Sequence, residues 1–250
     1  MKKSIVLTTL AATIALFFCG CADNTPEKSL SRAREAAVSG NWQEAYSLAE
    51  KLEEIYPQNI RVLLMLAVSA DKCGKTDRAI DAARRAVLLD DKSFAAQYTL
   101  GKIYSNIPER RNEALQILAK AYSLKNDDPA ALILMCNTAK ISGNRNYENY
   151  LKVLEKTDPA QRPGVRNNLG VAAAKRGDLK QAQSDFAVAT SAGEPVALLN
   201  TARFFDYYSR NPKFAVSFYR QFLRAAADKN EFAGDRAEVE RRIRQLQTKR

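Results

Sequence analysis

Residues 167–189 read NNLGVAAAKRGDLKQAQSDFAVA, and this stretch decides the fold. Small and apolar residues recur every three or four positions on both sides of Gly177, which predicts two amphipathic helices joined by a turn. The residues with this spacing are Leu169, Gly170, Ala173, Ala182, Phe186 and Ala189. Because Gly and Ala have little or no side chain, we expect the two helices to approach closely.

The same arrangement recurs at a fixed period along the chain. SGNWQEAYSLAEKLEEIYPQN starts at Ser39, CGKTDRAIDAARRAVLLDDKS starts at Cys73, and each has a glycine at its second position and an alanine five residues later. Gly40 and Gly74 are 34 residues apart. A unit of this size cannot bury its apolar face alone, so the period predicts a stack of helix-turn-helix units.

This pattern resembles the tetratricopeptide repeat, a helix-turn-helix unit of 34 residues. Four copies match in phase, and two further copies, around 132–159 and 197–227, are degenerate. The resemblance implies an all-α solenoid of about six helix-turn-helix repeats over residues 28–228. Residues 229–250 contain AEVERRIRQLQ, whose apolar stripe of Val239, Ile243 and Leu246 predicts a basic C-terminal capping helix. A helix that binds a partner or an anionic lipid surface is the alternative for this segment.

The resemblance also implies where a partner binds, because the first helix of each unit lines the concave surface in this family. The implied partner-binding groove consists of Leu64, Val68, Tyr98, Lys102, Asn137, Lys140, Asn167, Val171, Asn200, Phe204 and Tyr207. Asn137, Asn167 and Asn200 form a predicted amide ladder, since amides both donate to and accept from a peptide backbone. The alternative is that asparagine is common at such positions and forms no ladder.

Residues 204–219, FFDYYSRNPKFAVSFY, hold seven aromatic residues next to Arg210 and Lys213. Core packing explains most of these rings. Any ring that stays exposed is a candidate binding hot spot, because Tyr and Arg are favoured there. Tyr207 is the residue we expect to make such a contact.

The N-terminus resembles the signal of a bacterial lipoprotein. SIVLTTLAATIALFF, residues 4–18, is an uncharged run behind Lys2 and Lys3, too short for most membrane spans and of signal-peptide length. FCGCA resembles a lipobox, although Phe18 and Cys19 depart from its usual residues. The resemblance implies a signal peptide at 1–20, a lipidated Cys21 and a short tether at 21–27. An uncleaved anchor, a metal-binding cysteine pair and a disulfide are the alternatives.

The lipobox implies an exported protein that is lipid-anchored in a bacterial envelope. Ala22, instead of aspartate, follows Cys21, which favours the outer membrane, facing the periplasm. The size and six-unit layout resemble lipoproteins that assist assembly of outer-membrane or secretion machines. We therefore expect an adaptor that binds other envelope proteins, with membrane contact through the lipid.

The residue types that are present and the distribution of charge limit which classes of function we expect. The chain has no histidine and no phosphate-binding loop, so we expect no enzyme, no cofactor, no metal site and no small-molecule substrate. Because the lipobox implies export, we also expect no nucleic-acid partner. Cys73 and Cys136 are expected to be packed thiols. Residues 160–250 hold 17 Lys/Arg and 9 Asp/Glu. This imbalance is either a solvated surface or the basis of an alternative function, an envelope protein that holds peptidoglycan, anionic polysaccharide or lipid.

Overall fold

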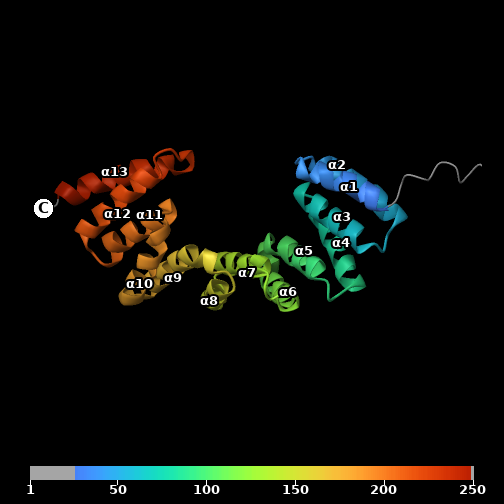
Figure 1. Cartoon of the computed structure of the whole chain (residues 1–250), viewed down its shortest axis with the longest axis horizontal. Helices are drawn as coiled ribbons and strands as arrows, with labels where there is room; N and C mark the ends of the chain where they lie inside the picture. Colours follow the sequence, from blue (N-terminus) through green and yellow to red (C-terminus); the bar gives the residue numbers. More distant parts are fainter. Residues whose placement is uncertain (1–25, 249–250) are drawn as a thin grey trace, which may run out of the picture. The chain divides into compact units, whose positions relative to one another are not determined.

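The computed structural model describes residues 26–248, and the described chain contains thirteen α-helices (Figure 1). The prediction of an all-α fold made of helix-turn-helix units is confirmed. Residues 1–25 and 249–250 lie outside the described part, which includes the predicted signal peptide and Cys21. The helix that follows begins at Pro26, two residues inside the segment expected to be a tether.

The chain divides into two compact units, Met1–Lys125 and Asn126–Arg250, and each contains three helical hairpins. The helices of the first unit are α1 (Pro26–Val38), α2 (Trp42–Ile55), α3 (Ile60–Lys72), α4 (Thr76–Leu89), α5 (Phe94–Ser105) and α6 (Arg111–Leu124). The second unit has α7 (Pro129–Ser142), α8 (Tyr147–Thr157), α9 (Arg162–Arg176), α10 (Leu179–Ala189), α11 (Pro195–Arg203), α12 (Pro212–Ala225) and α13 (Ala233–Thr248).

Short signals in the sequence set the helix ends. Asn59 caps α3, because its side-chain oxygen accepts hydrogen bonds from the backbone N–H groups of Arg61 and Val62 at 3.0 and 3.3 Å. Pro212 opens α12 at a position that needs no backbone N–H donor. Gly177 ends α9 with φ of 84°, a left-handed conformation that favours glycine. The turn predicted between the two runs of residues 167–189 is therefore present.

Two hairpins, one in each unit, close where a glycine of the first helix meets a large side chain of the second. A Cβ atom placed on Gly101 of α5 would lie 2.7 Å from Cγ and Cδ2 of Leu118 in α6. At Gly170 of α9, the nearest atoms are those of the Phe186 ring in α10, at 3.1 Å. These residues occupy equivalent places in their repeats, so the same contact sets the helix spacing in both units.

The core of each unit is built mainly from the helix faces predicted by the spacing. In the first unit, the alanine row of α4 is fully buried and consists of Ala79, Ala82, Ala83 and Ala86. In the second, Phe186, Tyr219 and Phe222 fill the centre. Cys136 is buried on α7, where burial raises the pKa of its thiol to about 12. Both described cysteines, Cys73 and Cys136, carry free thiols.

Helix α13 covers the last hairpin, at the place where a capping helix was predicted. Val239 and Ile243 are buried against the second core, and Leu246 packs at its edge. A partly buried ion pair adds to this apolar contact, because the Arg242 guanidinium donates two hydrogen bonds of 2.8 Å to Asp206. The sequence did not predict this pair, since the two residues are 36 positions apart.

Asp206 receives a third hydrogen bond, from the Tyr219 hydroxyl at 3.0 Å, and its side chain is only 2% exposed. Burial, followed by the Asp206 charge, raises the pKa of Tyr219, so the phenol remains a donor. The hydrogen bonds from Arg242 satisfy a carboxylate that would otherwise be buried without a counter-charge. α13 is thereby fixed on the turn that precedes α12.

We predict that Gly101→Ala lowers the free energy of unfolding by about 1–3 kcal/mol, because the new methyl group overlaps Leu118. Gly164→Ala in α9 is the matched control, since its Cβ has no neighbour within 4 Å. That substitution should stabilise by up to about 1 kcal/mol through helix propensity. Urea denaturation followed by circular dichroism measures both. A Gly101→Ala protein as stable as the parent would show that close approach does not set the hairpin spacing.

We predict that Arg242→Met destabilises the protein by about 3 kcal/mol, because Asp206 is left buried without its counter-charge. Arg241→Met, on the exposed side of α13, should change stability by less than about 0.5 kcal/mol. The double variant Asp206→Leu/Arg242→Met should recover part of the loss, since it removes both charges. Equal unfolding midpoints for the two single variants would refute the role given to this ion pair.

Candidate binding groove

A groove runs along the first helices of the second unit's hairpins, α7, α9 and α11. Its main pocket has a volume of about 550 Å³, and a neighbouring pocket of about 280 Å³ shares Lys140, Asn168 and Val171 with it. We call this pair of pockets the amide groove. The side chains that give it its chemistry are Lys140, Tyr147, Asn167, Asn168, Val171, Val196 and Asn200.

Two hydrogen bonds connect neighbouring repeats across the amide groove. Asn200 of α11 donates through Nδ2 to Oδ1 of Asn167 in α9, at 3.0 Å. Lys140 of α7 donates through Nζ to Oδ1 of Asn168, also at 3.0 Å. Within the described residues, the side-chain amide nitrogens of Asn167 and Asn168 and the side-chain oxygen of Asn200 make no further hydrogen bond. These groups are available to a ligand that both donates and accepts.

The smaller pocket is lined by the ring of Tyr147, the first residue of α8. Its hydroxyl is buried and has no hydrogen-bond partner in the described structure. Burial is the main reason that the pKa of Tyr147 is raised to about 12, and the nearby Cys136 and Glu148 add to the effect. The hydroxyl therefore stays protonated at neutral pH, and it lies among buried atoms near Cys136 while other atoms of Tyr147 line the pocket. Tyr147 was predicted only as part of a helix, because a lone Tyr at a helix start carries no binding signal.

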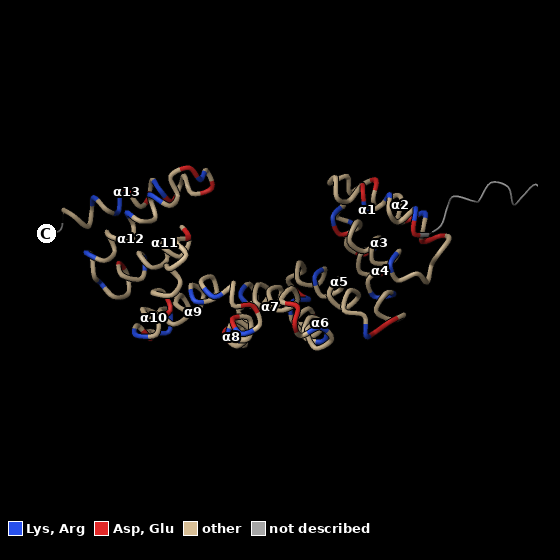
Figure 2. Tube along the Cα trace, in the orientation of Figure 1, with Lys and Arg blue, Asp and Glu red and all other residues tan. Residues whose placement is uncertain are grey.

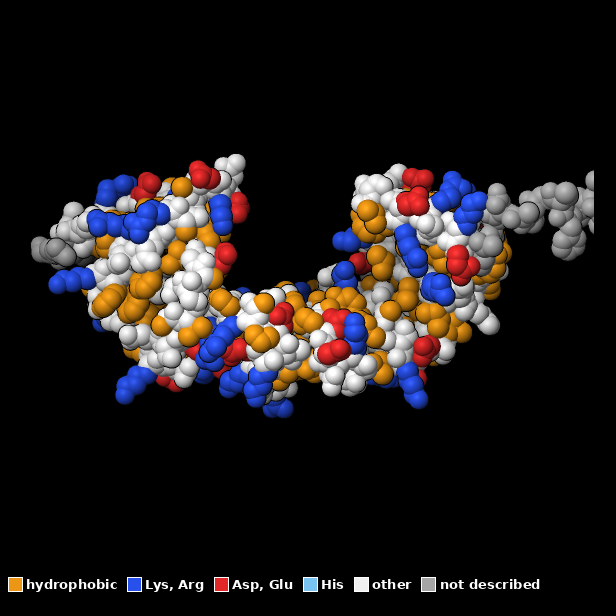
Figure 3. All heavy atoms as spheres, in the orientation of Figure 1, with side chains coloured by type: hydrophobic (Ala, Val, Ile, Leu, Met, Phe, Trp, Pro, Cys, Tyr) orange, Lys and Arg blue, Asp and Glu red, His pale blue; other side chains and the backbone are white. Residues whose placement is uncertain are grey.

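Apolar surface accompanies these polar groups. The Val196 side chain is 50% exposed at the start of α11, and Val171 is half-buried between the two pockets. Figure 3 shows hydrophobic side chains at the surface of each unit, interspersed with charged ones. The amide groove thus offers apolar contact beside a short row of amides.

Charged residues on the other side of α9 hold this helix in place. Arg166 donates from Nε to Glu155 of α8 at 2.8 Å and from Nη1 to Asp185 of α10 at 2.9 Å. The Glu155 hydrogen bond is the main reason that the pKa of Arg166 is raised. Because Asp185 is buried with its side chain 2% exposed, this network fixes α9 against both neighbouring second helices. Asn167 and Asn168 follow Arg166 directly on α9, so the same network also fixes their backbone positions.

The structure brings four of the predicted groove residues together, namely Lys140, Asn167, Val171 and Asn200. The predicted amide ladder exists only in part, because Asn137 is exposed on α7 and does not line either pocket. Asn168, the neighbour of Asn167, provides the contact to α7 instead. Helical spacing alone could not tell which of two adjacent asparagines would face α7.

The predicted position of Phe204 differs from its position in the structure. Its ring is 2% exposed and packs on Phe186, with ring centroids 5.3 Å apart. The reason is that residues Phe204–Tyr208 form a π-helical turn, so the regular spacing extrapolated from Asn200 does not apply. An aromatic ring also gains more from burial than from exposure at a groove. Tyr207 in the same turn is 53% exposed, and Arg242 lies over its ring at 5.4 Å.

The remaining predicted groove residues belong to the first unit. Leu64 and Val68 are half-buried on α3, and Leu64 packs against the core. Tyr98 stacks on Phe94 of the same helix at 5.6 Å, while Lys102 is exposed. These four residues lie on the first helices α3 and α5, as predicted.

The basic excess of the C-terminal part is visible along α12 and α13 (Figure 2). In residues 26–248, no group of three or more His, Cys, Asp or Glu side chains is arranged to hold a metal ion. None of the described helices has the length and apolar character of a membrane span.

Comparison with known proteins supports this helical-repeat architecture. Residues 38–103 match the tetratricopeptide repeat family. No curated protein matches this chain in sequence.

Solved structures show the same fold at low sequence identity. PilF of Pseudomonas aeruginosa is 17% identical, with a TM-score of 0.65 over 85% of this chain and 97% of that one. PilW, described as a widely conserved type IV pilus biogenesis factor, is 19% identical, with a TM-score of 0.64 over 84% and 97%. YrrB, described as having an unusual peptide-binding site, is 20% identical, with a TM-score of 0.56 over 72% and 93%.

Proposed function

From the premise that this chain is a tetratricopeptide-repeat protein, we propose that it is an adaptor that binds a polypeptide segment of a partner in the amide groove. The observation that carries this proposal is the Asn200–Asn167 hydrogen bond with its unused amide groups. Tyr147 and the exposed Val196 line the same groove. A polypeptide backbone presents alternating N–H and C=O groups, and its side chains supply the apolar contact.

We also propose that the protein is located in the bacterial envelope and takes part in the assembly of a membrane machine. PilF and PilW match this fold over nearly their whole length, and PilW is a pilus biogenesis factor. Together with the lipobox-like FCGCA at 18–22, this supports an adaptor anchored through Cys21 in a bacterial envelope, where it assists assembly of a membrane machine. Two or more acyl chains on one cysteine give stable membrane attachment, whereas one chain gives only marginal binding.

The groove is tested by photocrosslinking in cells of the native host. A benzoylphenylalanine at position 196, inside the groove, should crosslink a specific envelope protein. The same probe at position 88, which is 84% exposed on α4, serves as the control and should not capture that protein. Peptides that cover the crosslinked region of the partner are then used to measure affinity.

We predict that the double variant Asn168→Ala/Asn200→Ala weakens binding of that peptide about tenfold or more, because two hydrogen-bonding side chains of the groove are lost. Asn137→Ala is the matched control, since this amide is exposed on α7 outside the groove, and it should bind like the parent. Fluorescence anisotropy gives both dissociation constants. Equal losses in the control and the double variant would argue against the groove as the binding surface.

We predict that Cys21→Ser moves the protein from the membrane fraction to the soluble fraction of the envelope, with an unchanged circular dichroism spectrum. The serine hydroxyl cannot replace the thiol that receives the lipid. Fractionation followed by mass spectrometry of the N-terminal peptide measures both the location and the acylation. A Cys21→Ser protein that stays in the membrane fraction would rule out the lipid anchor.

A further inference from the structure

A second cleft lies between α12, α13 and the π-helical turn, and it shares no residue with the amide groove. Its volume is about 1130 Å³. We call it the basic cleft. The residues that give it its character are Arg210, Lys213, Ser217, Arg220, Arg224 and Gln247.

The charge of this cleft is strongly unbalanced. α12 contains Lys213, Arg220 and Arg224 and no acidic residue. The lining includes one acid, Asp206, which is already bound by Arg242 and Tyr219. Within the described residues, none of the other four cations forms an ion pair. A cluster of unpaired cations in a concave surface attracts and concentrates anions.

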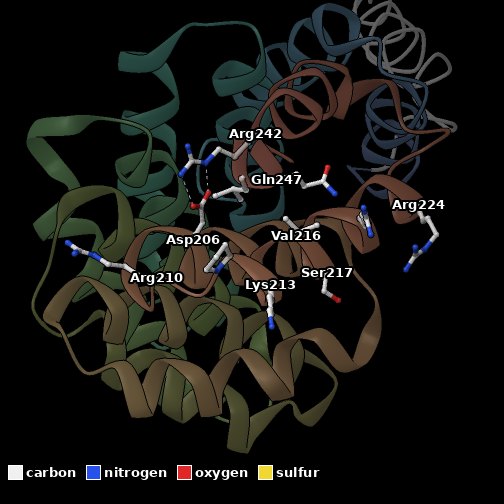
Figure 4. Close-up of a pocket in the computed structure, with 11 residues that line it drawn as sticks. Asp206, Arg210, Lys213, Val216, Ser217, Arg224, Arg242 and Gln247 are labelled. Carbon is white, nitrogen blue, oxygen red and sulfur yellow. Dashed lines mark hydrogen bonds and ion pairs between the residues drawn. The ribbon is translucent and has the colours of Figure 1, made fainter. Parts of the chain in front are cut away.

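The walls of the basic cleft are held in place by the surrounding structure. The Asp206–Arg242 ion pair fixes α13 at one side, as the dashed lines in Figure 4 show. Arg210 has a φ of 52°, the one described residue other than glycine with a positive φ. The turn keeps this strained conformation because the N–H of Asn211 donates to the carbonyl of Phe205 at 2.7 Å. Arg210 is therefore positioned at the cleft by its backbone.

The cations are spread out and do not converge on one point (Figure 4). Lys213 and Arg224 are eleven residues apart on α12, which corresponds to about 16 Å along the helix axis. A single small anion can contact only one or two such groups. An extended chain advances about 3.3 Å per residue, so a segment of about five residues covers the same length.

We propose that the basic cleft binds an acidic segment of a partner protein. Most of its cations are arginines, whose planar guanidinium groups match carboxylates through two parallel hydrogen bonds. Ser217 and Gln247 can pair with backbone amide groups, and Val216 and Leu246 provide apolar surface between them. A concave site of this kind suits a chain that enters along its length better than the flat surface of a membrane.

This inference is independent of the amide groove, because the two sites have no residue in common. A partner with an acidic segment and a second contact region could use both sites of the second unit at once. Linked binding of this kind raises the overall affinity without any new contact within either site.

The test uses the full-length protein in a non-ionic detergent and a fluorescent hexaglutamate peptide as the probe. The variant Lys213→Gln/Arg220→Gln/Arg224→Gln should bind the peptide at least tenfold more weakly than the parent. The matched control, Lys180→Gln/Arg241→Gln/Arg244→Gln, removes the same charge from exposed positions of the same unit that do not line the cleft. It should change the affinity less than twofold. Binding of the parent should weaken as salt is raised.

Three results would overturn the proposal. The first is an equal loss of affinity in the two triple variants, which would mean that net charge alone holds the peptide. The second is binding of hexaglutamine as tight as that of hexaglutamate. The third is binding of dextran sulfate or phosphatidylglycerol micelles that depends on the cleft while hexaglutamate does not bind, since the ligand would then be a glycan or a lipid. Circular dichroism confirms that each variant is folded, and the single variant Arg220→Gln replaces any that is not.

Discussion

The close approach of two helices through a residue without a side chain is the constraint on which the rest of this structure depends. Gly101 lies against Leu118 and Gly170 against the Phe186 ring, with no space for a methyl group at the first position without movement. Helix spacing in a hairpin decides which side chains of the first helix face the core and which face outward. Because the interior is close-packed, adding even one methylene group at this contact shifts the surface residues on the same helix.

The amide groove follows from that constraint. Because α9 is closed on α10 through Gly170 and Phe186 and is held by Arg166, its residues 167 and 168 have a defined direction. Asn167 then meets Asn200 of α11, and Asn168 meets Lys140 of α7. The proposed binding chemistry is thus shared among three repeats, which is how a repeat fold builds an extended surface from units that are individually small.

At the C-terminal end, a single added helix covers the apolar face of the last hairpin, which would otherwise be exposed to solvent. α13 covers the apolar face of the last hairpin with Val239 and Ile243, and the partly buried Asp206–Arg242 ion pair connects it to the π-helical turn. The same arrangement leaves Lys213, Arg220 and Arg224 without acidic neighbours along α12. The cap and the basic cleft therefore come from one set of contacts, so the stability of this end and its surface charge are linked.

The periodic spacing of glycine and alanine was enough to predict the fold class, the hairpins and the faces that form the cores. The resemblance to the tetratricopeptide repeat then implied that Lys140, Asn167, Val171 and Asn200 lie on first helices, where the structure has them. These predictions depend on local periodicity, which a helix converts directly into a face. Pro212 at the start of α12 and Gly177 at the end of α9 are also local signals, because proline fixes its own φ and glycine accepts the left-handed conformation.

The sequence by itself determined that this chain folds into helical hairpins, because each hairpin is specified by residues within about 34 positions. Only the tertiary structure decided that Asn168 pairs with Lys140, that Tyr147 keeps an unpartnered hydroxyl, that Phe204 is buried and that Asp206 binds Arg242. Each of these depends on a contact between helices or on a π-helical turn that breaks the regular spacing. Helical periodicity describes one helix at a time, whereas a binding surface is made where several helices meet.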